Sequence, residues 1–360
     1  MPTGSSARPS CQMETTDTRG AAAACAADAA VHRGLQKLAN GASFIEEFSH
    51  VKRSLRDATG VSYDEFKRRL LPRYAVAWAS IGAVYLAIVA AVMSTVAAQR
   101  FEFFPAPLEV IVGAFAFGFC VHCLLLFLHE AIHFNLARSR TLNDLLANVF
   151  LCPLLGLDLQ TFRACHFEHH KYLGTPNDTE TSYFTQLTPR FVIESLLGIR
   201  IVRALVERRR LRRRAGISGA FSSPARVLSS AALHLGIFVA GGYTGQYALA
   251  TAWGLGVVVV APSLNLIRQI IEHRDFEAKA GIDYTRVAHG AVVRNFGTGL
   301  FASTYGAAGF NRHLLHHLEP QISCTRLREL EAFLDTTTMG PRLAECRATY
   351  ATAFARLMRA

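Results

Sequence analysis

The sequence lacks the paired cysteines that a disulfide framework or a zinc knuckle requires. Among its eight cysteines only Cys120 and Cys123 form a C-x-x-C pair, and that pair lies inside an apolar stretch. We interpret both as small buried side chains and expect the cysteines to be reduced. Residues 1–20 are polar and the alanine-rich stretch 21–30 is short, so we expect no secretory signal and predict a disordered tail over residues 1–40.

Charged side chains are also scarce, at 18% of the 360 residues, whereas hydrophobic ones make up 51% and the mean hydropathy is +0.22. This composition exceeds what the core of an ordinary soluble domain needs, and it predicts an all-α protein that crosses a membrane several times. Four segments are apolar enough to be spanning helices, which need about 20 residues. They cover about residues 75–97, 106–128, 227–241 and 246–266.

We expect these four segments to form two hairpins, which place both termini on one side of the membrane. Residues 129–226, between the hairpins, carry fourteen lysines and arginines, whereas the short loops at 98–105 and 241–245 carry only Arg100. The positive-inside rule therefore places residues 129–226 in the cytoplasm. The apolar segment 141–159 contains two aspartates and a proline, so we interpret it as a re-entrant or interfacial helix buried against protein.

Two shorter segments flank the membrane domain, which we assign to residues 75–335. Residues 41–74 space apolar side chains helically, among them Phe44 and Phe48, and end in a basic cluster. This pattern is typical of interfacial amphipathic helices. We predict a C-terminal cytoplasmic helix over residues 336–360.

The stretch ERRRLRRR, residues 207–214, supplies six arginines in eight positions. No aromatic side chain interleaves with them, which argues against nucleic-acid binding. We interpret the stretch as a cytoplasmic anchor beside anionic lipid.

Histidines are the most informative residues, because nine of the fourteen fall in a few short clusters. The stretch FLHEAIHFN carries His129, Glu130 and His133 in the H-E-x-x-H pattern of zinc proteases, in which the glutamate is the base. Two later sets share the pattern H-x-x-H-H, whose spacing puts three imidazoles on one face of a helix. These sets are His166, His169 and His170, and then His313, His316 and His317.

The three clusters and His273 fall on the predicted cytoplasmic side or at its membrane boundary. Nine imidazoles are too many for one zinc ion, which takes about four ligands, and they suit a pair of metal ions. An intramembrane zinc protease with Glu130 as its base would need a third ligand from a later apolar segment, and it leaves seven clustered histidines unexplained. A metal transporter, the non-enzyme alternative, would place its ligands within the spans to form a path.

The order of these motifs over residues 75–335, with the ending HLEP after the third, resembles the membrane fatty acid desaturase family of di-iron enzymes. The resemblance implies two Fe²⁺ ions, O₂ as cosubstrate, and the formation of a double bond in a fatty acyl chain of a lipid or acyl thioester. Hydroxylation or ketolation of a lipid or carotenoid begins with the same hydrogen abstraction and stays open. The implied metal ligands are His129, His133, His166, His169, His170, His273, His313, His316 and His317.

Carboxylates near these ligands should orient them and balance the charge of the metals. Gln269 occupies the place, one turn before His273, where some members of the family have an asparagine linked to iron through water. The carboxylate candidates are Glu130, Glu168, Asp178 and Glu319.

The sequence has no haem-binding H-P-G-G stretch and no Gly-rich dinucleotide fold, so we expect a separate electron donor. A ferredoxin, rubredoxin or cytochrome with its reductase would supply the electrons. We predict that the arginine-rich surface docks this acidic carrier, which makes turnover sensitive to salt. Similarity to bacterial acyl desaturases implies the bacterial inner membrane, with the active site and both termini cytoplasmic. The docking candidates are Arg208, Arg209, Arg210 and Arg212.

Overall fold

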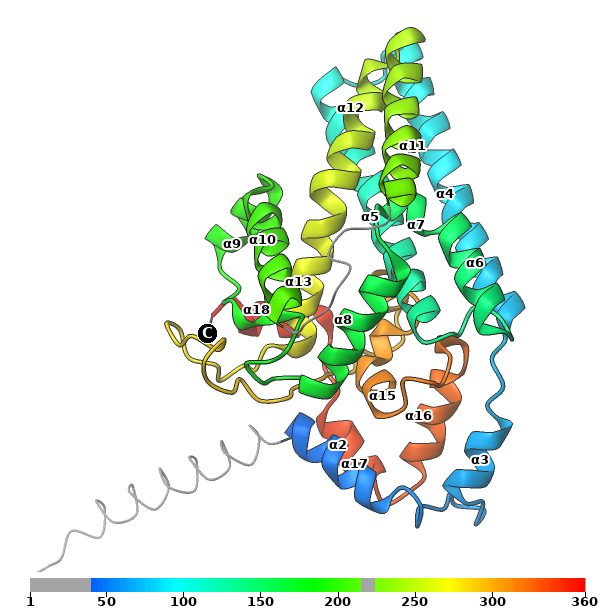
Figure 1. Ribbon diagram of the computed structural model, residues 1–360, viewed down its shortest axis with the longest axis vertical. Coiled ribbons are helices and arrows are strands. Elements are labelled where there is room, and N and C mark those ends of the chain that lie inside the picture. The colour runs from blue at the N-terminus through cyan, green and yellow to red at the C-terminus, as the bar shows by residue number, and fades with distance from the viewer. Residues whose placement is uncertain (1–39, 215–223, 360) are drawn as a thin grey trace, which may run out of the picture.

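The computed structural model describes residues 40–214 and 224–359, in which the regular elements are helices and two isolated β-bridges, without a strand. Figure 1 shows long helices side by side in one half of the molecule and a cap of shorter helices in the other half. The predicted all-α class is confirmed. The predicted disordered tail lies outside the described residues.

Within residues 40–214 and 224–359, three helices are long and apolar enough to cross a membrane. They are α4 (Tyr74–Phe101), α5 (Ala106–Ile132) and a continuous helix over Tyr247–His273 that comprises α12 (Tyr247–Leu255), η2 (Gly256–Val260) and α13 (Ala261–His273). Their length and composition identify an integral membrane protein.

The prediction of a fourth span over residues 227–241 is not confirmed. Helix α11 (Pro224–Tyr243) runs beside α12 in the bundle (Figure 1), but its apolar part covers only Leu228–Tyr243. This part is shorter than the roughly 20 residues that a spanning helix needs.

The chain reverses sharply between α4 and α5 because its local sequence ends one helix and starts the next. Glu102 adopts a left-handed conformation and its N–H bonds to the last turn of α4. Pro105 immediately precedes α5, where its fixed φ of −56° suits the start of a helix. One face of α4 is buried at Ile81 and Ile88, and its other apolar side chains face outward, with Leu86 71% exposed, as expected for a helix that meets lipid.

Glycines allow α5 and η2 to approach closely. A Cβ added at Gly118 would lie 2.5 Å from the Val260 side chain, and one at Gly256 would lie 2.9 Å from the Ala114 carbonyl. The π-helical segment η2 ends two residues before Pro262, whose ring would clash with the carbonyl of the preceding turn in a normal α-helix. This contact fixes the helix that ends at His273 against the helix that carries His129.

We expect Gly118→Ala to destabilise the protein by about 1–3 kcal/mol, because the new methyl group overpacks a closed contact. Thermal unfolding in detergent measures the change. Gly82→Ala is the matched control, since a Cβ at Gly82 in α4 meets nothing within 4 Å. This control should be neutral or slightly stabilising. Equal melting temperatures for the two variants would contradict the close packing.

The segment 141–159 forms no continuous helix, and the predicted burial against protein holds for one face, where Ala147, Leu151 and Leu154 pack in the core. It comprises α6 (Arg140–Phe150), α7 (Cys152–Leu155) and the start of α8 (Leu159–Tyr172). Leu145 and Val149 on α6 are 57% and 55% exposed, so α6 presents an apolar face outward.

The cap also corrects two expectations about the flanking segments. Phe44 and Phe48 on α2 (Asn40–Val51) are fully buried against the cap, so this face of α2 meets protein and not lipid. The predicted C-terminal helix is two helices, α17 (Gly340–Glu345) and α18 (Tyr350–Leu357). The other α-helices of the described residues are α3 (Tyr63–Arg69), α9 (Pro189–Leu196), α10 (Ile199–Arg214), α14 (Leu300–Tyr305), α15 (His313–Leu318) and α16 (Leu327–Asp335).

Candidate metal centre

Four helices bring all nine predicted histidine ligands together. His129 lies in the last turn of α5 and His133 caps its end, while α8 and α15 carry the two H-x-x-H-H sets and α13 ends at His273. Buried Arg163 of α8 fixes two of these helices against each other. Its guanidinium donates to the carbonyls of Ala131 and Ile132 at the end of α5, at 2.9 and 2.8 Å.

Five of the imidazoles form a first group, in which the ligand nitrogens all lie within 4.8 Å of one another. His166 Nε2 lies 2.8 Å from His129 Nε2 and 2.9 Å from His170 Nε2. His170 Nε2 also lies 3.1 Å from His316 Nε2. The members of this group are His129, His133, His166, His170 and His316.

The other four imidazoles form a second group beside the first. His313 Nε2 lies 2.9 Å from His273 Nε2 and 3.1 Å from His317 Nε2. His169 completes the group, because its ligand nitrogen lies within 4.8 Å of those of His273 and His317. The structure thus divides the nine histidines into a set of five and a set of four.

The nitrogen atoms in these groups fit metal ions better than they fit one another. His166 Nδ1 lies 2.9 Å from the Glu180 carboxylate, so the ring proton belongs on Nδ1 and a lone pair is left on Nε2. One lone pair can accept one N–H, yet two further Nε2 atoms lie within 2.9 Å of it. Buried His133 Nε2 has no hydrogen-bond partner among the described residues. Convergent imidazole lone pairs of this kind suit iron, copper or zinc.

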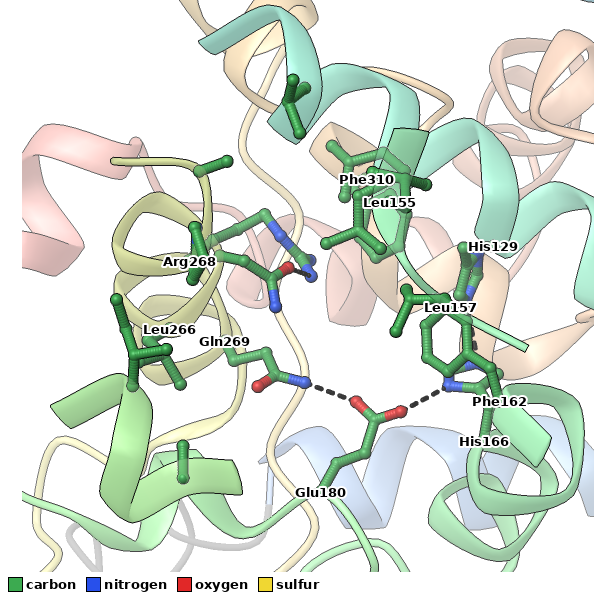
Figure 2. A pocket seen from close by; sticks show the side chains of 18 of the residues that line it. His129, Leu155, Leu157, Phe162, His166, Glu180, Leu266, Arg268, Gln269 and Phe310 are labelled. Carbon is green, nitrogen blue, oxygen red and sulfur yellow. Dashed lines mark hydrogen bonds and ion pairs between the residues drawn. The ribbon is translucent and has the colours of Figure 1, made fainter. Parts of the chain in front are cut away.

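Two carboxylates bind imidazole rings of the metal centre through their Nδ1 atoms, which point away from the grouped Nε2 atoms. Asp178 accepts from His169 Nδ1 at 2.9 Å and also from the hydroxyl of buried Tyr183. Glu180 binds His166 Nδ1 on one side and the amide of Gln269 on the other, as Figure 2 shows. The expected role of Asp178 beside a ligand agrees with these contacts. Gln269 reaches a ligand only through Glu180.

Glu180 was not among the sequence candidates, although a signal for it exists. It stands two residues after Asp178 in the stretch NDTE that follows the second histidine set. The turn between them is fixed by the N–H of Glu180, which donates to the Asp178 carboxylate at 2.7 Å.

Three other carboxylate candidates do not bind an imidazole. Glu130 accepts from the Cys324 N–H at 2.9 Å, so it ties α5 to the segment that follows the third histidine set. Glu319 pairs with Lys52 and Lys67 and joins that segment to the N-terminal helices. Glu168 makes no hydrogen bond or ion pair to a ring within the described part of the chain. These three carboxylates stand near the histidine motifs in the sequence, but their contacts in the structure are with other groups.

Burial and local charge set the protonation of the rings that lie outside the spans. Burial and then the neighbouring imidazoles hold the pKa of His170 and His316 well below its ordinary value. Burial also lowers the pKa of His169, but Asp178 and Glu180 outweigh it and raise that pKa to about 9. The first group is therefore neutral with its lone pairs available, and the carboxylates favour positive charge beside His169.

We expect Asp178→Asn to lower metal affinity or activity by about 10–100-fold, because the amide no longer fixes the tautomer and orientation of His169. Metal content after dialysis against a chelator measures the effect. Glu168→Gln removes a nearby carboxylate that touches no ring and should leave metal content unchanged. Equal metal retention by the two variants would contradict the role of Asp178.

A mostly apolar cavity of about 350 Å³ opens onto the centre. Its walls come from α5, α7, α8, α10, η2 and α13, and include Leu155, Leu205 and Val258. Five of the nine histidines line it, and Glu180 lies between His166 and Gln269 at its edge (Figure 2). A flexible hydrocarbon chain is the kind of molecule that such a cavity holds.

The arginine-rich segment forms the end of α10. Arg209 and Arg210 are exposed there. The side chains of Arg208 and Arg212 lie outside the described residues.

Comparison with protein-family models gives one result for this chain. Residues 102–338, more than half of the chain, match the model described as fatty acid desaturase. This range contains all nine histidines of the two groups and the helices that carry them. No curated protein matches the chain.

Proposed function

The chain belongs to the fatty acid desaturase family, and we propose that it is an O₂-dependent di-iron desaturase that introduces a double bond into a fatty acyl chain. The acyl chain would be carried by a lipid or an acyl thioester. The observation that carries this proposal is the placement of nine imidazoles, eight of them buried and that of His170 half-buried, in sets of five and four at the end of an apolar cavity.

The nine histidines would hold two iron ions, which together with O₂ supply an oxidant for an unactivated C–H bond. Asp178 and Glu180 accept from Nδ1 of His169 and His166, which orients each ring so that its Nε2 would bind a metal ion in place of a proton. The apolar walls align the chain and exclude water from the reacting carbons. The substrate loses two hydrogens, an external donor provides two electrons, two protons come from solvent, and O₂ leaves as two water molecules.

The donor that we propose is a separate ferredoxin, rubredoxin or cytochrome with its reductase, docked at the exposed arginines of α10. Replacement of both Arg209 and Arg210 with glutamate should slow electron transfer and remove its salt dependence, because steering by opposite charge weakens. Turnover with each donor at rising ionic strength measures this effect. Arg328→Glu, an exposed charge reversal on α16, should leave the salt dependence intact. A double variant that behaves like Arg328→Glu would place the docking surface elsewhere.

We further propose that the protein lies in the bacterial inner membrane with the metal centre and both termini in the cytoplasm. The support is the concentration of lysine and arginine between residues 129 and 226. Both termini on one side require an even number of spans, so we propose that α11, whose 20 residues include a short apolar part, crosses the membrane beside α12 as a fourth span. Helix α10 would lie at the membrane surface.

Lipid profiling by mass spectrometry after expression tests the activity. The wild-type protein should add a double bond to acyl chains, and His317→Ala should not. A new hydroxyl or keto group would instead identify a hydroxylase or ketolase with the same metal centre. One zinc ion per chain in metal analysis would favour a protease, and a translocated ion would favour a transporter.

A further inference from the structure

We propose that Glu272 is a carboxylate ligand of the metal ion held by the set of four histidines, and that Arg268 positions it. This inference rests on the proposed function, because it assumes the same pair of irons. It makes the two metal sites chemically different, one with histidines alone and one with a carboxylate.

Glu272 has the geometry of a ligand. Its carboxylate forms a candidate metal-binding group with His273 and His313, whose ligand atoms all lie within 4.8 Å of one another. Glu272 Oε2 lies 3.6 Å from His313 Nε2, the nitrogen that also faces His273 and His317. Two ligand atoms bound at about 2.1 Å to one ion lie roughly 3 to 4 Å apart, so this separation suits a shared metal.

The other carboxylates of the centre lie on a different side of the rings. Asp178 and Glu180 bind the Nδ1 atoms of His169 and His166, which point away from the convergent Nε2 atoms. Glu272 Oε2 instead approaches the Nε2 side of His313. It is also fully buried and lines the cavity, where an anion beside a cationic pair of metals offsets charge.

The number of ligands in each group is the second reason to assign Glu272 as a metal ligand. The first group has five imidazoles and the second has four, so a carboxylate would bring the second metal ion to the same ligand count. Carboxylate ligands accompany histidine at non-haem iron sites. Gln269, which occupies the place where some members of the family have an asparagine linked to iron through water, hydrogen-bonds to Glu180 and Ser182.

Arg268 holds Glu272 in place from one helical turn earlier. Its guanidinium donates to Glu272 Oε2 and, at 2.9 Å, to the side-chain carbonyl of Asn265. The same guanidinium stacks over the ring of Phe310 at 4.1 Å. Figure 2 shows the Arg268 side chain extending from α13 into the cavity.

The simpler explanation is that Arg268 and Glu272 form a structural ion pair with no metal role. The two explanations predict different outcomes for a double variant. Removal of one partner of a buried pair leaves an uncompensated charge and destabilises the protein, whereas removal of both does not. If Glu272 is instead a metal ligand, the double variant still lacks its carboxylate and still loses the metal ion.

The experiment compares Glu272→Gln, Arg268→Met and the double variant Arg268→Met/Glu272→Gln. Each is purified in detergent, loaded with ⁵⁷Fe²⁺ and measured for iron per chain and for its Mössbauer spectrum. We expect about two irons in two inequivalent sites for the wild type. Arg268→Met keeps Glu272 and should still bind about two irons, but the spectrum of the carboxylate-bound site should shift because Glu272 is no longer held in place. Glu272→Gln and the double variant should both fall to about one iron, with one ferrous site missing from the spectrum.

Recovery of two irons and an unchanged spectrum in the double variant would overturn the proposal, because the pair would then be only structural. Glu194→Gln is the matched control, since Glu194 is a buried carboxylate paired with arginines away from the histidines. It should keep two irons. If the wild type itself binds no pair of irons, the proposed function fails, and this outcome is distinct from failure of the ligand role alone.

Discussion

His316→Ala should abolish product formation and remove iron from the set of five histidines. His316 is buried, and its Nε2 lies 3.1 Å from that of His170, with the ring of His133 at 4.6 Å between centroids. Loss of this imidazole opens a coordination position in the middle of the group, where no other described side chain can replace it. We expect activity to fall by at least about 10³-fold, equivalent to 4 kcal/mol or more in the barrier.

Iron content and product formation together measure this prediction. His234→Ala is the matched control, because His234 in α11 binds the Leu154 carbonyl and the Trp253 indole and lies outside both groups. The control removes a half-buried imidazole on another helix and should retain both irons. Normal iron content in His316→Ala would remove this residue from the ligand set.

Ala204→Trp should abolish product formation while leaving the iron content unchanged. Ala204 lies on α10 and lines the apolar cavity, so an indole at this position occupies the volume that the acyl chain needs. The cavity holds only about 350 Å³, and a tryptophan side chain takes a large part of it. We expect at least about a 100-fold loss of turnover with the metal centre intact.

Val202→Trp tests whether the effect is specific to the cavity. Val202 stands on the same helix two residues earlier and is 62% exposed, so an indole there points away from the cavity. It should retain most of the activity. If Ala204→Trp turns over like Val202→Trp, the substrate does not use this cavity.

His316→Ala and Ala204→Trp separate the metal centre from the substrate site, because His316→Ala should lose iron and Ala204→Trp should keep it. A protein that loses iron in both variants would instead have a metal site that depends on the packing of α10. Iron content is therefore the measurement to make first.

Local spacing was sufficient to find eight of the nine histidines, whereas His273 was found from its place after the last predicted span and from the family resemblance. The i, i+3 and i+4 spacing of these eight puts each set on one helical face, and this relation depends only on the period of the helix. The all-α class and three long apolar helices also follow from local composition, because length and hydropathy decide which segments can cross a membrane.

Carboxylate partners could not be chosen from the sequence with the same success. Glu130 and Glu168 stand beside ligand histidines in the chain, but neighbouring residues on a helix point in different directions. Glu130 consequently meets Cys324, whereas Glu180 reaches His166 from a separate turn. A bond between distant segments is decided by how the helices pack.

The sequence by itself determined the fold class, the metal-binding residue types and the resemblance to a desaturase, because each depends on local pattern and spacing. Only the tertiary structure decided the division into five and four imidazoles, the approach of Glu272 to the second group, and the cavity between α5, α10 and α13. These features depend on the distances between helices. Close contacts such as Gly118 against Val260 set those distances, and no single segment encodes them.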